Sequence, residues 1–494
     1  MSRRIAGSHS FAGAILRGAA TPGVTLPERS WRPCSGRIDW GGHMAEPLDL
    51  VVIGTGEGGS GPAYRCRRAG WRVAVVDELP YGGTCALRGC DPKKVLVGAA
   101  ELTDWRRRME GRGVSGDAHI SWPDLMRFKR TFTDPVPADR EKAFQQAGIS
   151  TPHGPARFLS PERLSVDGQV LEARHFVISA GAKPRRLGIP GEEYLLTSTA
   201  YLELDQLPPR IAFLGAGYIS FEFAHVSRRA GAQATIIGRG KPLQHFEQDL
   251  VTRLTDHTRS LGIDVRVDAE VTAIEQRAGR DVVQVHSHGR VETLEAEAVV
   301  HGGGRVPNTE GLDLQAANVA TEPNGGVRVN EFLQSVSNPR VYAAGDAAAS
   351  PGSLPLTPVA AYEGVIVASN LLNGNTQRPD YRGIPSVVFT VPALAGVGLT
   401  EAEARQRQLD IRVKAEDTSG WYSNRRVAET CAMFKVIEDS QTGRILGAHL
   451  LGPHAEEVIN LFALGIRSGL PATDLKHLLY AYPTSGADVP YMIP

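Results

Sequence analysis

A strand, a glycine-rich turn, a helix and a second strand follow one another near the start of the chain. The apolar run Leu48–Ile53 precedes the glycines Gly54, Gly56 and Gly59, and a second apolar run, Trp71–Val76, follows a helix-like stretch. This order predicts a βαβ unit with two parallel strands. Gly54 permits the tight turn, Gly56 lets the backbone approach a pyrophosphate, and Gly59 lets the helix pack closely on the strand.

The same layout recurs in the middle of the chain. There the run Ile211–Leu214 leads to Gly215 and Gly217, a helix and the run Ala234–Ile237, with Ser220 at the third glycine position. Serine is small, so we expect the helix to pack on the strand at some cost. The chain therefore contains two nucleotide-binding lobes.

The end of each second strand indicates which nucleotide is bound. Asp77 lies 23 residues after Gly54, where a carboxylate accepts a hydrogen bond from a ribose hydroxyl. The corresponding position of the second lobe is Gly238, and Arg239 follows. A guanidinium binds a 2′-phosphate that an acid would repel, so we predict NADPH rather than NADH. The alternative is that Arg239 and Lys241 are solvated loop charges.

Length and charge exclude several classes of protein. A chain of 494 residues is too long for one hydrophobic core, and no apolar run approaches the ~20 residues of a membrane helix. Lys plus Arg and Asp plus Glu number 54 each, so no net charge attracts nucleic acid or an acidic membrane. We expect a cytoplasmic protein of two to four domains, with no nucleic-acid or membrane partner.

Residues 1–45 differ in composition from the rest of the chain. They are rich in Arg, Ser, Gly and Pro and show no sustained hydrophobic period. We expect a disordered tail, or translated sequence upstream of a true start at Met44. An organelle transit peptide is the alternative. Cys34 belongs to this segment.

The cysteine pair Cys85 and Cys90 carries the strongest chemical signal. On a straight helix, residues five apart are separated by about 7.5 Å along the axis, whereas a disulfide needs Cα atoms within about 6.8 Å. A bridge therefore requires an irregular helix start, which the neighbouring glycines and Pro92 permit. A thiolate at a helix N-terminus near a lysine has a lowered pKa. The five-residue spacing is not that of a zinc knuckle, and we predict no metal site.

Other apolar runs predict further strands. The expected strands are Leu164–Val170, Ala173–Ser179, Asp264–Ile274, Asp281–His286, Val291–His301 and the run that starts at Val341. Beyond about Arg382 the pattern changes to mixed helices and strands, including an amphipathic stretch at Ala455–Arg467. We expect a third domain there.

The run from Gly82 to Lys94, Gly-Gly-Thr-Cys-x4-Cys-x-Pro-x-Lys, occurs together with both glycine turns. In this combination residues 46–494 resemble the FAD-dependent pyridine nucleotide–disulfide oxidoreductases, such as glutathione reductase, dihydrolipoamide dehydrogenase and mercuric reductase. The resemblance implies two Rossmann-like domains, for FAD and NAD(P)H, and a C-terminal α+β dimerisation domain. It also implies the boundaries: an FAD-binding domain at 46–188 and 308–380, a NAD(P)H-binding domain at 189–307, and an interface domain at 381–494.

The resemblance further implies roles for individual residues. Cys85 is similar to the interchange thiol that attacks substrate, and Cys90 to the thiol beneath the flavin. Lys93 and Glu222 resemble the ion pair beside flavin N5, and Tyr218 the ring that covers the nicotinamide pocket. As alternatives, Glu222 is a surface acid and Tyr218 a packing aromatic. The remaining residues implied to bind the cofactors are Gly83, Thr84, Gly181, Gly304, Arg305, Gly345, Asp346 and Thr357.

One part of the family pattern is missing. The family's disulfide reductases end in His-Pro-Thr-x-x-Glu, in which the histidine acts as acid and base in the partner subunit's site. Here Tyr482 replaces the histidine and Ala487 the glutamate. Tyrosine, with a reference pKa near 10, is a poor base at neutral pH. Asp488, His449 and His454 are the candidates to replace the dyad.

The C-terminal sequence also limits which electron acceptors are expected. Mercuric reductases use a C-terminal cysteine pair, but this chain ends Tyr491-Met-Ile-Pro494. We therefore predict a homodimeric NADPH-dependent flavoenzyme that reduces a disulfide or thiol-reactive acceptor through Cys85 and Cys90. The alternatives are direct electron transfer from flavin to a quinone, metal ion or nicotinamide, and a redox sensor without turnover.

Overall fold

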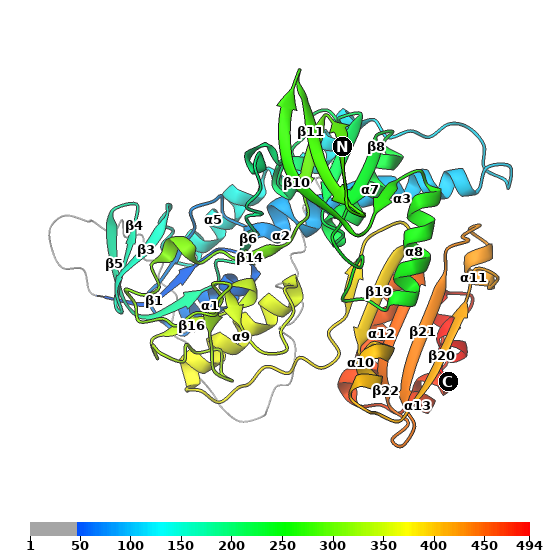
Figure 1. Ribbon diagram of the computed structural model, residues 1–494. Coiled ribbons are helices and arrows are strands. Elements are labelled where there is room, and N and C mark those ends of the chain that lie inside the picture. The colour runs from blue at the N-terminus through cyan, green and yellow to red at the C-terminus, as the bar shows by residue number, and fades with distance from the viewer. Residues whose placement is uncertain (1–46) are drawn as a thin grey trace, which may run out of the picture. The chain divides into compact units, whose positions relative to one another are not determined.

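The computed structural model describes residues 47–494, which form three main sheets with their helices (Figure 1). The predictions for residues 1–45, Cys34 and Met44 lie outside the described residues. Within 47–494, no helix is both long and apolar enough to span a membrane. The predicted fold class, with two parallel α/β units and a C-terminal α+β unit, is confirmed.

The first sheet is centred on the strand that precedes the first glycine turn. Its order is β2-β1-β5-β4-β3, with β16 also paired to β5. The pairs β1–β2, β1–β5 and β5–β16 are parallel, whereas β3, β4 and the start of β5 pair antiparallel. The strands are β1 (Leu48–Ile53), β2 (Val73–Val76), β3 (Ala156–Ser160), β4 (Arg163–Val166), β5 (Gln169–Ile178) and β16 (Val341–Ala343).

The second sheet is wholly parallel, in the order β13-β7-β8-β9. Its strands are β7 (Arg210–Leu214), β8 (Gln233–Ile237), β9 (Asp264–Arg266) and β13 (Ala298–His301). A separate antiparallel sheet is formed by β10 (Ala269–Arg277), β11 (Arg280–Ser287) and β12 (Arg290–Ala296). Two short two-stranded ribbons pair β6 (Ala182–Pro184) with β14 (Arg305–Pro307) and β15 (Val327–Arg328) with β17 (Ala348–Ala349).

The third sheet, orange in Figure 1, is antiparallel in the order β18-β19-β22-β21-β20. Its strands are β18 (Ser386–Val388), β19 (Ala393–Gly398), β20 (Ile411–Asp417), β21 (Met433–Asp439) and β22 (Ile445–Gly452). Side chains alternate along β19, so Ala395 belongs to the same buried cluster as Phe462 of α12 (Ala455–Ser468), while Leu394 belongs to the cluster that contains Leu254 of α8 (Gln248–Ser260). The sheet thus lies between these two helices.

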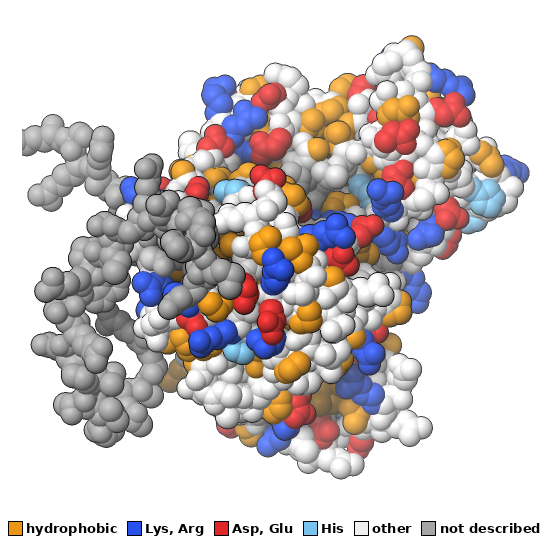
Figure 2. Space-filling view, turned by 90° about the vertical axis from the view of Figure 1, so that its left-hand side faces the viewer, with side chains coloured by type: hydrophobic (Ala, Val, Ile, Leu, Met, Phe, Trp, Pro, Cys, Tyr) orange, Lys and Arg blue, Asp and Glu red, His pale blue; other side chains and the backbone are white. Residues whose placement is uncertain are grey.

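Helices cover one face of each parallel sheet. The other face packs on β3, β4 and residues 312–327 in the first sheet and on β10, β11 and β12 in the second. Burial on both faces explains why the strands β1, β2 and β7 are almost entirely apolar. The helices are α1 (Glu57–Arg68), α2 (Gly83–Arg88), α3 (Cys90–Arg108), α4 (Trp122–Thr133), α5 (Val136–Gln146), α6 (Ser198–Tyr201), α7 (Tyr218–Arg229), α8 (Gln248–Ser260), α9 (Thr357–Asn373), α10 (Glu401–Gln406), α11 (Tyr422–Arg425), α12 (Ala455–Ser468), α13 (Ala472–His477) and α14 (Val489–Met492). On the face shown in Figure 2, acidic and basic side chains are interspersed, in keeping with their equal totals.

Three strand predictions were wrong in their limits. The expected strand Asp264–Ile274 is β9 and β10 of different sheets, because the chain turns at Asp268 with a positive φ of 53°. The expected strand Val291–His301 likewise divides into β12 and β13. The run Leu164–Val170 is interrupted by a turn at Asp167 and Gly168, after which β5 begins. In each case one continuous apolar pattern crosses a turn between strands.

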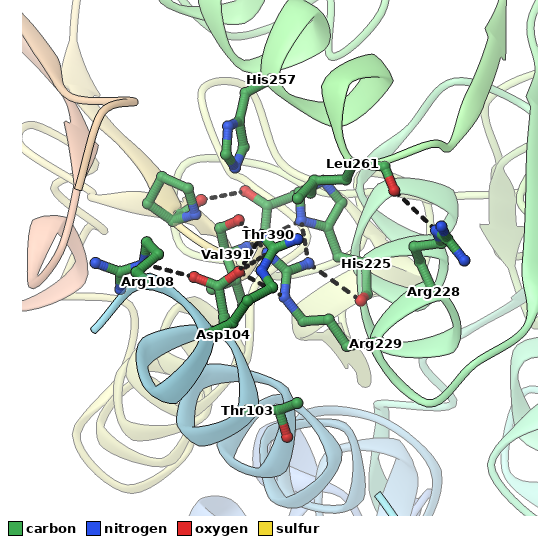
Figure 3. Close-up of polar contacts among 12 residues, drawn as sticks. Thr103, Asp104, Arg108, His225, Arg228, Arg229, His257, Leu261, Thr390 and Val391 are labelled. Atoms are coloured by element: carbon green, nitrogen blue, oxygen red, sulfur yellow. Dashed lines mark hydrogen bonds and ion pairs between the residues drawn. The ribbon is translucent and has the colours of Figure 1, made fainter. Parts of the chain in front are cut away.

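A buried ion pair holds α3 against α7 (Figure 3). The Asp104 carboxylate of α3 accepts hydrogen bonds from Arg229 Nη2 of α7 at 2.8 Å and from Arg108 Nε at 2.8 Å. Burial raises the pKa of Asp104, but the charges of Arg229 and Arg108 outweigh it and leave the pKa below 3.8. Arg229 Nη2 also donates to the carbonyl oxygen of Val391 at 3.0 Å, so the pair connects three segments of the chain.

His225 completes this connection. Its Nδ1 accepts from the backbone N–H of Val391 at 3.1 Å, so its Nε2 carries the proton and donates to Thr258 Oγ1 at 2.9 Å. Burial holds the pKa of His225 well below 6.5, so the ring is neutral. The α3–α7 pair is therefore tied to α8 and to the segment before β19.

We predict that Asp104→Asn lowers the free energy of unfolding by about 3 kcal/mol, because Arg229 then keeps a buried charge without the carboxylate that it contacts. Urea denaturation followed by circular dichroism measures this. The folded-state pKa of Asp104 is depressed, so its contribution is present above about pH 3.8 and is lost as the pH falls. The control is Glu110→Gln, an exposed partner of Arg106. Equal effects of the two variants would contradict the assignment.

Candidate active site

One cavity gathers most of the residues predicted to act in catalysis or to bind the first nucleotide. Its lining includes the first glycine turn, the cysteine segment, the starts of α7 and α9, and the turn after β16. The predicted residues that line it are Gly54, Gly56, Asp77, Gly83, Thr84, Cys85, Cys90, Lys93, Gly181, Tyr218, Glu222, Arg305, Gly345, Asp346 and Thr357. Gly59 is not among the lining residues, and its role is in packing.

A second cavity surrounds the second glycine turn. Gly215, Gly217, Tyr218, Arg239 and Gly304 line it. Tyr218 lines both cavities, and its side chain is 49% exposed. A single aromatic ring therefore borders both predicted nucleotide sites.

The first turn has the geometry that its glycines predict. Gly54 has a φ of 104°, and a Cβ there would lie 2.3 Å from the carbonyl oxygen of Ser179. A Cβ on Gly59 would lie 2.2 Å from the carbonyl oxygen of Gly54, so the helix packs on the turn as expected. A Cβ on Gly83 would lie 2.4 Å from the Cα of Gly56, which brings the cysteine segment against the turn.

Asp77 has a structural partner that the sequence did not reveal. Its Oδ2 accepts from the backbone N–H of Thr55 at 2.9 Å and from Thr55 Oγ1 at 2.6 Å, and its Oδ1 accepts from Leu79 N–H. The carboxylate thus fixes the turn while it lines the cavity. α1 begins at this turn without a side-chain cap, so its first N–H groups are available to a diphosphate. These features fit the adenosine diphosphate part of FAD.

The two cysteines lie on either side of a break between helices. Cys85 belongs to α2 and Cys90 is the first residue of α3, with Gly89 between them at φ −142° and ψ −113°. The predicted irregular helix start is therefore present. Both cysteines are free thiols in this structure.

The surroundings of the two thiols differ. Hydrogen bonds from Cys85 and from Thr357 Oγ1, 3.3 Å from Cys90 Sγ, and the charge of Lys93 lower the pKa of Cys90 to about 6, although burial opposes this. The same interaction with Cys90, together with burial, raises the pKa of Cys85. These opposite shifts favour Cys90 as the thiolate of the pair and Cys85 as the protonated thiol.

Lys93 and Glu222 form the predicted ion pair. Lys93 Nζ donates to Glu222 Oε1 at 2.9 Å, and Glu222 is 2% exposed, so it is not a surface acid. The sequence did not predict Phe389, whose backbone N–H donates to Glu222 Oε1 at 2.8 Å and whose ring centroid lies 4.2 Å from Lys93 Nζ. The pair thus joins α3, α7 and the segment after β18 at the wall of the cavity.

Glu363 is a third residue that sequence reasoning missed. It is fully buried in α9 and accepts from the backbone N–H of Gly345 at 2.6 Å and from Ser353 Oγ at 2.8 Å. Gly345 has a φ of 68°, and Asp346 follows it at the cavity wall. Burial raises the pKa of Asp346, and the charge of Arg305 opposes this. The only sequence signal for Glu363 is an acid within an apolar helix.

The second glycine turn shows the cost of its serine. Gly215 has a φ of 101°, and a Cβ there would lie 2.3 Å from the carbonyl oxygen of Gly302. The Ser220 side chain is fully buried against Gly302, and its Oγ has no hydrogen-bond partner. An unsatisfied buried hydroxyl costs about 1–3 kcal/mol. The helix nevertheless packs against the turn, as expected.

Arg239 lies at the second cavity with an acidic partner. Its Nη1 is 3.2 Å from Glu270 Oε1, and both side chains are exposed. Glu270 and Lys241 line the same cavity. A 2′-phosphate that binds Arg239 has to compete with Glu270.

Tyr482 lines neither cavity. Its side chain is 83% exposed and lies near the end of the chain with other exposed apolar residues, Leu478, Leu479 and Tyr491. Of the candidates to replace the missing dyad, His449 is buried and bonded to the carbonyl oxygen of Leu399, and Asp488 accepts a hydrogen bond from Ser423 Oγ. His454 is exposed at the start of α12. The geometry within one subunit therefore supports neither His449 nor Asp488.

Comparison with known proteins identifies two family domains. Residues 48–364 match the pyridine nucleotide-disulphide oxidoreductase model, and residues 384–492 match the dimerisation domain of the same family. The chain is 32% identical to glutathione reductase of Burkholderia cepacia, over 88% of this chain and 96% of that protein. It is 31% identical to mercuric reductase of Staphylococcus aureus, over 92% of this chain and 83% of that protein.

Among solved structures, the chain is similar to the Cu(II) complex of the HOCl-induced flavoprotein disulfide reductase RclA from Escherichia coli. The TM-score is 0.81 at 27% identity, over 91% of this chain and 99% of that one. The two glycine turns and the cysteine pair at the helix break agree with both domain matches. The chain belongs to the pyridine nucleotide-disulphide oxidoreductase family.

Proposed function

We propose that this protein uses NADPH to reduce a disulfide or another thiol-reactive acceptor through FAD and the Cys85–Cys90 pair. The observation that carries the proposal is the unequal pair of thiols at the wall of the first cavity. Cys90 is stabilised as a thiolate, while Cys85 keeps its proton and is the residue assigned to attack the acceptor. A thiolate next to a thiol is the arrangement required to reduce a disulfide in two exchange steps.

The residues of the first cavity would hold FAD in an order set by their chemistry. The start of α1 suits the diphosphate, Asp77 a ribose hydroxyl, and Asp346 the ribityl chain. Lys93, Cys90 and the start of α9 at Thr357 would lie at the flavin ring. FAD, when bound, accepts electrons from a reduced nicotinamide and makes them available to the cysteine pair.

Lys93 and Glu222 are proposed to act on the same ring. The ion pair places a positive charge at the cavity wall, and Glu222 holds Lys93 in position from a second helix. Positive charge near the flavin favours its reduced, anionic form. Tyr218, at the border of both cavities, would cover the nicotinamide site until NADPH enters.

The domain division remains a proposal in the form expected from the sequence. The FAD-binding domain is assigned to 46–188 and 308–380, the NAD(P)H-binding domain to 189–307 and the interface domain to 381–494. Since residues 384–492 match a dimerisation domain, we propose a homodimer. The exposed Tyr482 and Leu479 would then be contributed to the partner subunit's site.

Two of the proteins that this chain resembles favour thiol-binding metal ions as alternative acceptors. One relative is a mercuric reductase, and the RclA structure is a Cu(II) complex. Such ions bind thiolates and need no proton for a leaving group. Among residues 47–494, no group of three or more His, Cys, Asp or Glu forms a metal site.

Two further alternatives use the flavin differently. In the first, the flavin passes electrons directly to a quinone or second nicotinamide, and the cysteines only store electrons. In the second, the protein is a redox sensor that is reduced once and does not turn over. The first prediction below separates these alternatives from the proposal.

We predict that Cys85→Ser reduces the NADPH-dependent reduction of a disulfide to background but leaves the reduction of a quinone largely intact. The reason is that only the disulfide requires the attacking thiol. Steady-state assays with both acceptors measure this, and Cys66→Ala, a buried cysteine outside both cavities, is the control. Disulfide reduction that survives in Cys85→Ser would favour direct transfer from the flavin. A wild-type protein that turns over on neither acceptor would favour the sensor.

We predict that Arg239→Ala raises the KM for NADPH by about tenfold to a hundredfold and leaves the KM for NADH nearly unchanged. A charge-assisted contact with the 2′-phosphate contributes about 1.5–3 kcal/mol. Glu270→Gln is expected to lower the KM for NADPH, because it removes the carboxylate that competes for Arg239. If Arg239→Ala leaves the KM for NADPH unchanged, Arg239 is only a loop charge.

We predict that wild-type protein reduces glutathione disulfide slowly compared with activated disulfides, and that Tyr482→His raises the glutathione disulfide rate by about tenfold or more. A neutral tyrosine cannot cycle a proton well at pH 7, and poor leaving thiolates need one. Turnover with each disulfide measures this, with Tyr422→His as the control at another exposed tyrosine. Rapid wild-type turnover of glutathione disulfide would contradict the prediction.

A further inference from the structure

The missing histidine leaves the attacking thiol without its usual acid and base. Cys85 is expected to carry a proton at neutral pH, because its interaction with Cys90 and its burial both raise its pKa. To attack a disulfide it has to lose that proton, and the departing thiolate has to gain one. The proposed function therefore needs a proton acceptor within reach of Cys85 Sγ.

Cys90 also contacts Cys85, but its thiolate is needed for the second exchange step, and Asp91 is a carboxylate within reach of Cys85 Sγ. Its Oδ1 lies 3.9 Å from Cys85 Sγ, within the range of a hydrogen bond donated by sulfur. It is the second residue of α3, immediately after Cys90, and it is accessible to solvent. Asp91 is not among the residues that line the cavity of the two thiols. Asp91 therefore contacts Cys85 from outside this cavity and does not separate Cys85 from Cys90.

We propose that Asp91 is a catalytic acid and base for this site, and that it takes the proton from the Cys85 thiol and passes it to the leaving thiolate. This inference rests on the proposed function. The substrate class is a small disulfide that reaches Cys85 from the solvent side of the pair.

The two exchange steps balance as follows. In the first, Cys85 Sγ bonds to one sulfur of the disulfide and the disulfide bond breaks, while the Cys85 proton moves to Asp91 and then to the first departing sulfur. In the second, the Cys90 thiolate bonds to Cys85 Sγ, and the second sulfur departs and takes a proton from water. The dithiol loses two electrons, the substrate gains two, and two thiols leave.

The charged groups around Asp91 fit this role. Partial burial raises the pKa of Asp91, which makes it a better base, while the hydrogen bond from Cys85 and the charge of Arg140 in α5 oppose the shift. Arg140 Nη2 also lies 3.6 Å from Glu57 Oε1 of α1, so the positive charge of Arg140 is divided between two carboxylates. An aspartate is still a weaker base than imidazole, and this agrees with the predicted slow reduction of glutathione disulfide.

A helix-stabilising role is the alternative, because an acid in the first turn of a helix interacts favourably with the helix dipole. That role predicts no large loss of rate near pH 7 in Asp91→Asn. Removal of a negative charge 3.9 Å from Cys85 Sγ lowers the Cys85 pKa in either case, so the test compares the rate of the Cys85 reaction across pH. Asp91→Asn retains the size and hydrogen-bonding capacity of the side chain and removes only its charge and basicity.

The experiment is the pH profile of a single oxidation of NADPH-reduced enzyme by a small symmetrical disulfide. In the wild type, the rate rises with pH through the ionisation of Asp91 and then levels off. In Asp91→Asn we expect about a hundredfold loss at pH 7. We also expect the rising part of the pH–rate profile to move to alkaline pH, because only the Cys85 thiolate then reacts. Asp91→Glu should recover part of the rate, and Asp124→Asn, in the first turn of α4, should behave like the wild type.

A second measurement follows Cys85 without turnover. In protein reduced with dithiothreitol, iodoacetamide labelling of Cys85 across pH, read by peptide mass spectrometry, should show a lower thiol pKa in Asp91→Asn, because a neighbouring negative charge is removed. An unchanged pH–rate profile or an unchanged Cys85 titration in Asp91→Asn would overturn the role of Asp91. Absence of disulfide reduction by the wild type would instead overturn the proposed function, and the labelling would still test the Asp91–Cys85 contact.

Discussion

The pairing of α3 with α7 is the constraint on which the active site depends. α3 begins with Cys90 and carries Lys93, while α7 begins with Tyr218 and carries Glu222. Buried ion pairs join the two helices near both ends, Lys93 with Glu222 and Asp104 with Arg229. Each pair is also hydrogen-bonded to the segment between β18 and β19, through Phe389 and Val391. The two cavities proposed to bind nucleotides therefore meet where two helices are joined by buried ion pairs.

The fold could be predicted wherever a local pattern determines it. The limits of β1 agree with the apolar run Leu48–Ile53, because the glycine turn that follows cannot continue a strand. The prediction was wrong at Asp264–Ile274, where an apolar pattern continues through a turn at Asp268 into another sheet. Periodicity reports which side chains are buried, but it does not report which sheet buries them.

Most of the residues that line the first cavity could be predicted from the sequence, but the residues that hydrogen-bond to them could not. The glycine turns, the cysteine pair and the pair Lys93–Glu222 each have a signature in the sequence. Thr55, Phe389 and Glu363 have none, because they act through backbone groups or across long sequence separations. Asp91 stood within the cysteine motif itself, but its meaning emerged only when its carboxylate was found beside Cys85. The difference between the two thiols likewise arises from their surroundings rather than from their spacing.

The proposed function depends on electrons that reach the cysteine pair from NADPH. The most direct measurement is anaerobic addition of one equivalent of NADPH to the oxidised FAD-containing protein, followed by iodoacetamide and peptide mass spectrometry. The proposed function predicts that Cys85 and Cys90 both become alkylated, whereas neither is labelled without NADPH and the labelling of Cys66 and Cys431 does not change. Consumption of NADPH without any new labelling at Cys85 and Cys90 would contradict it.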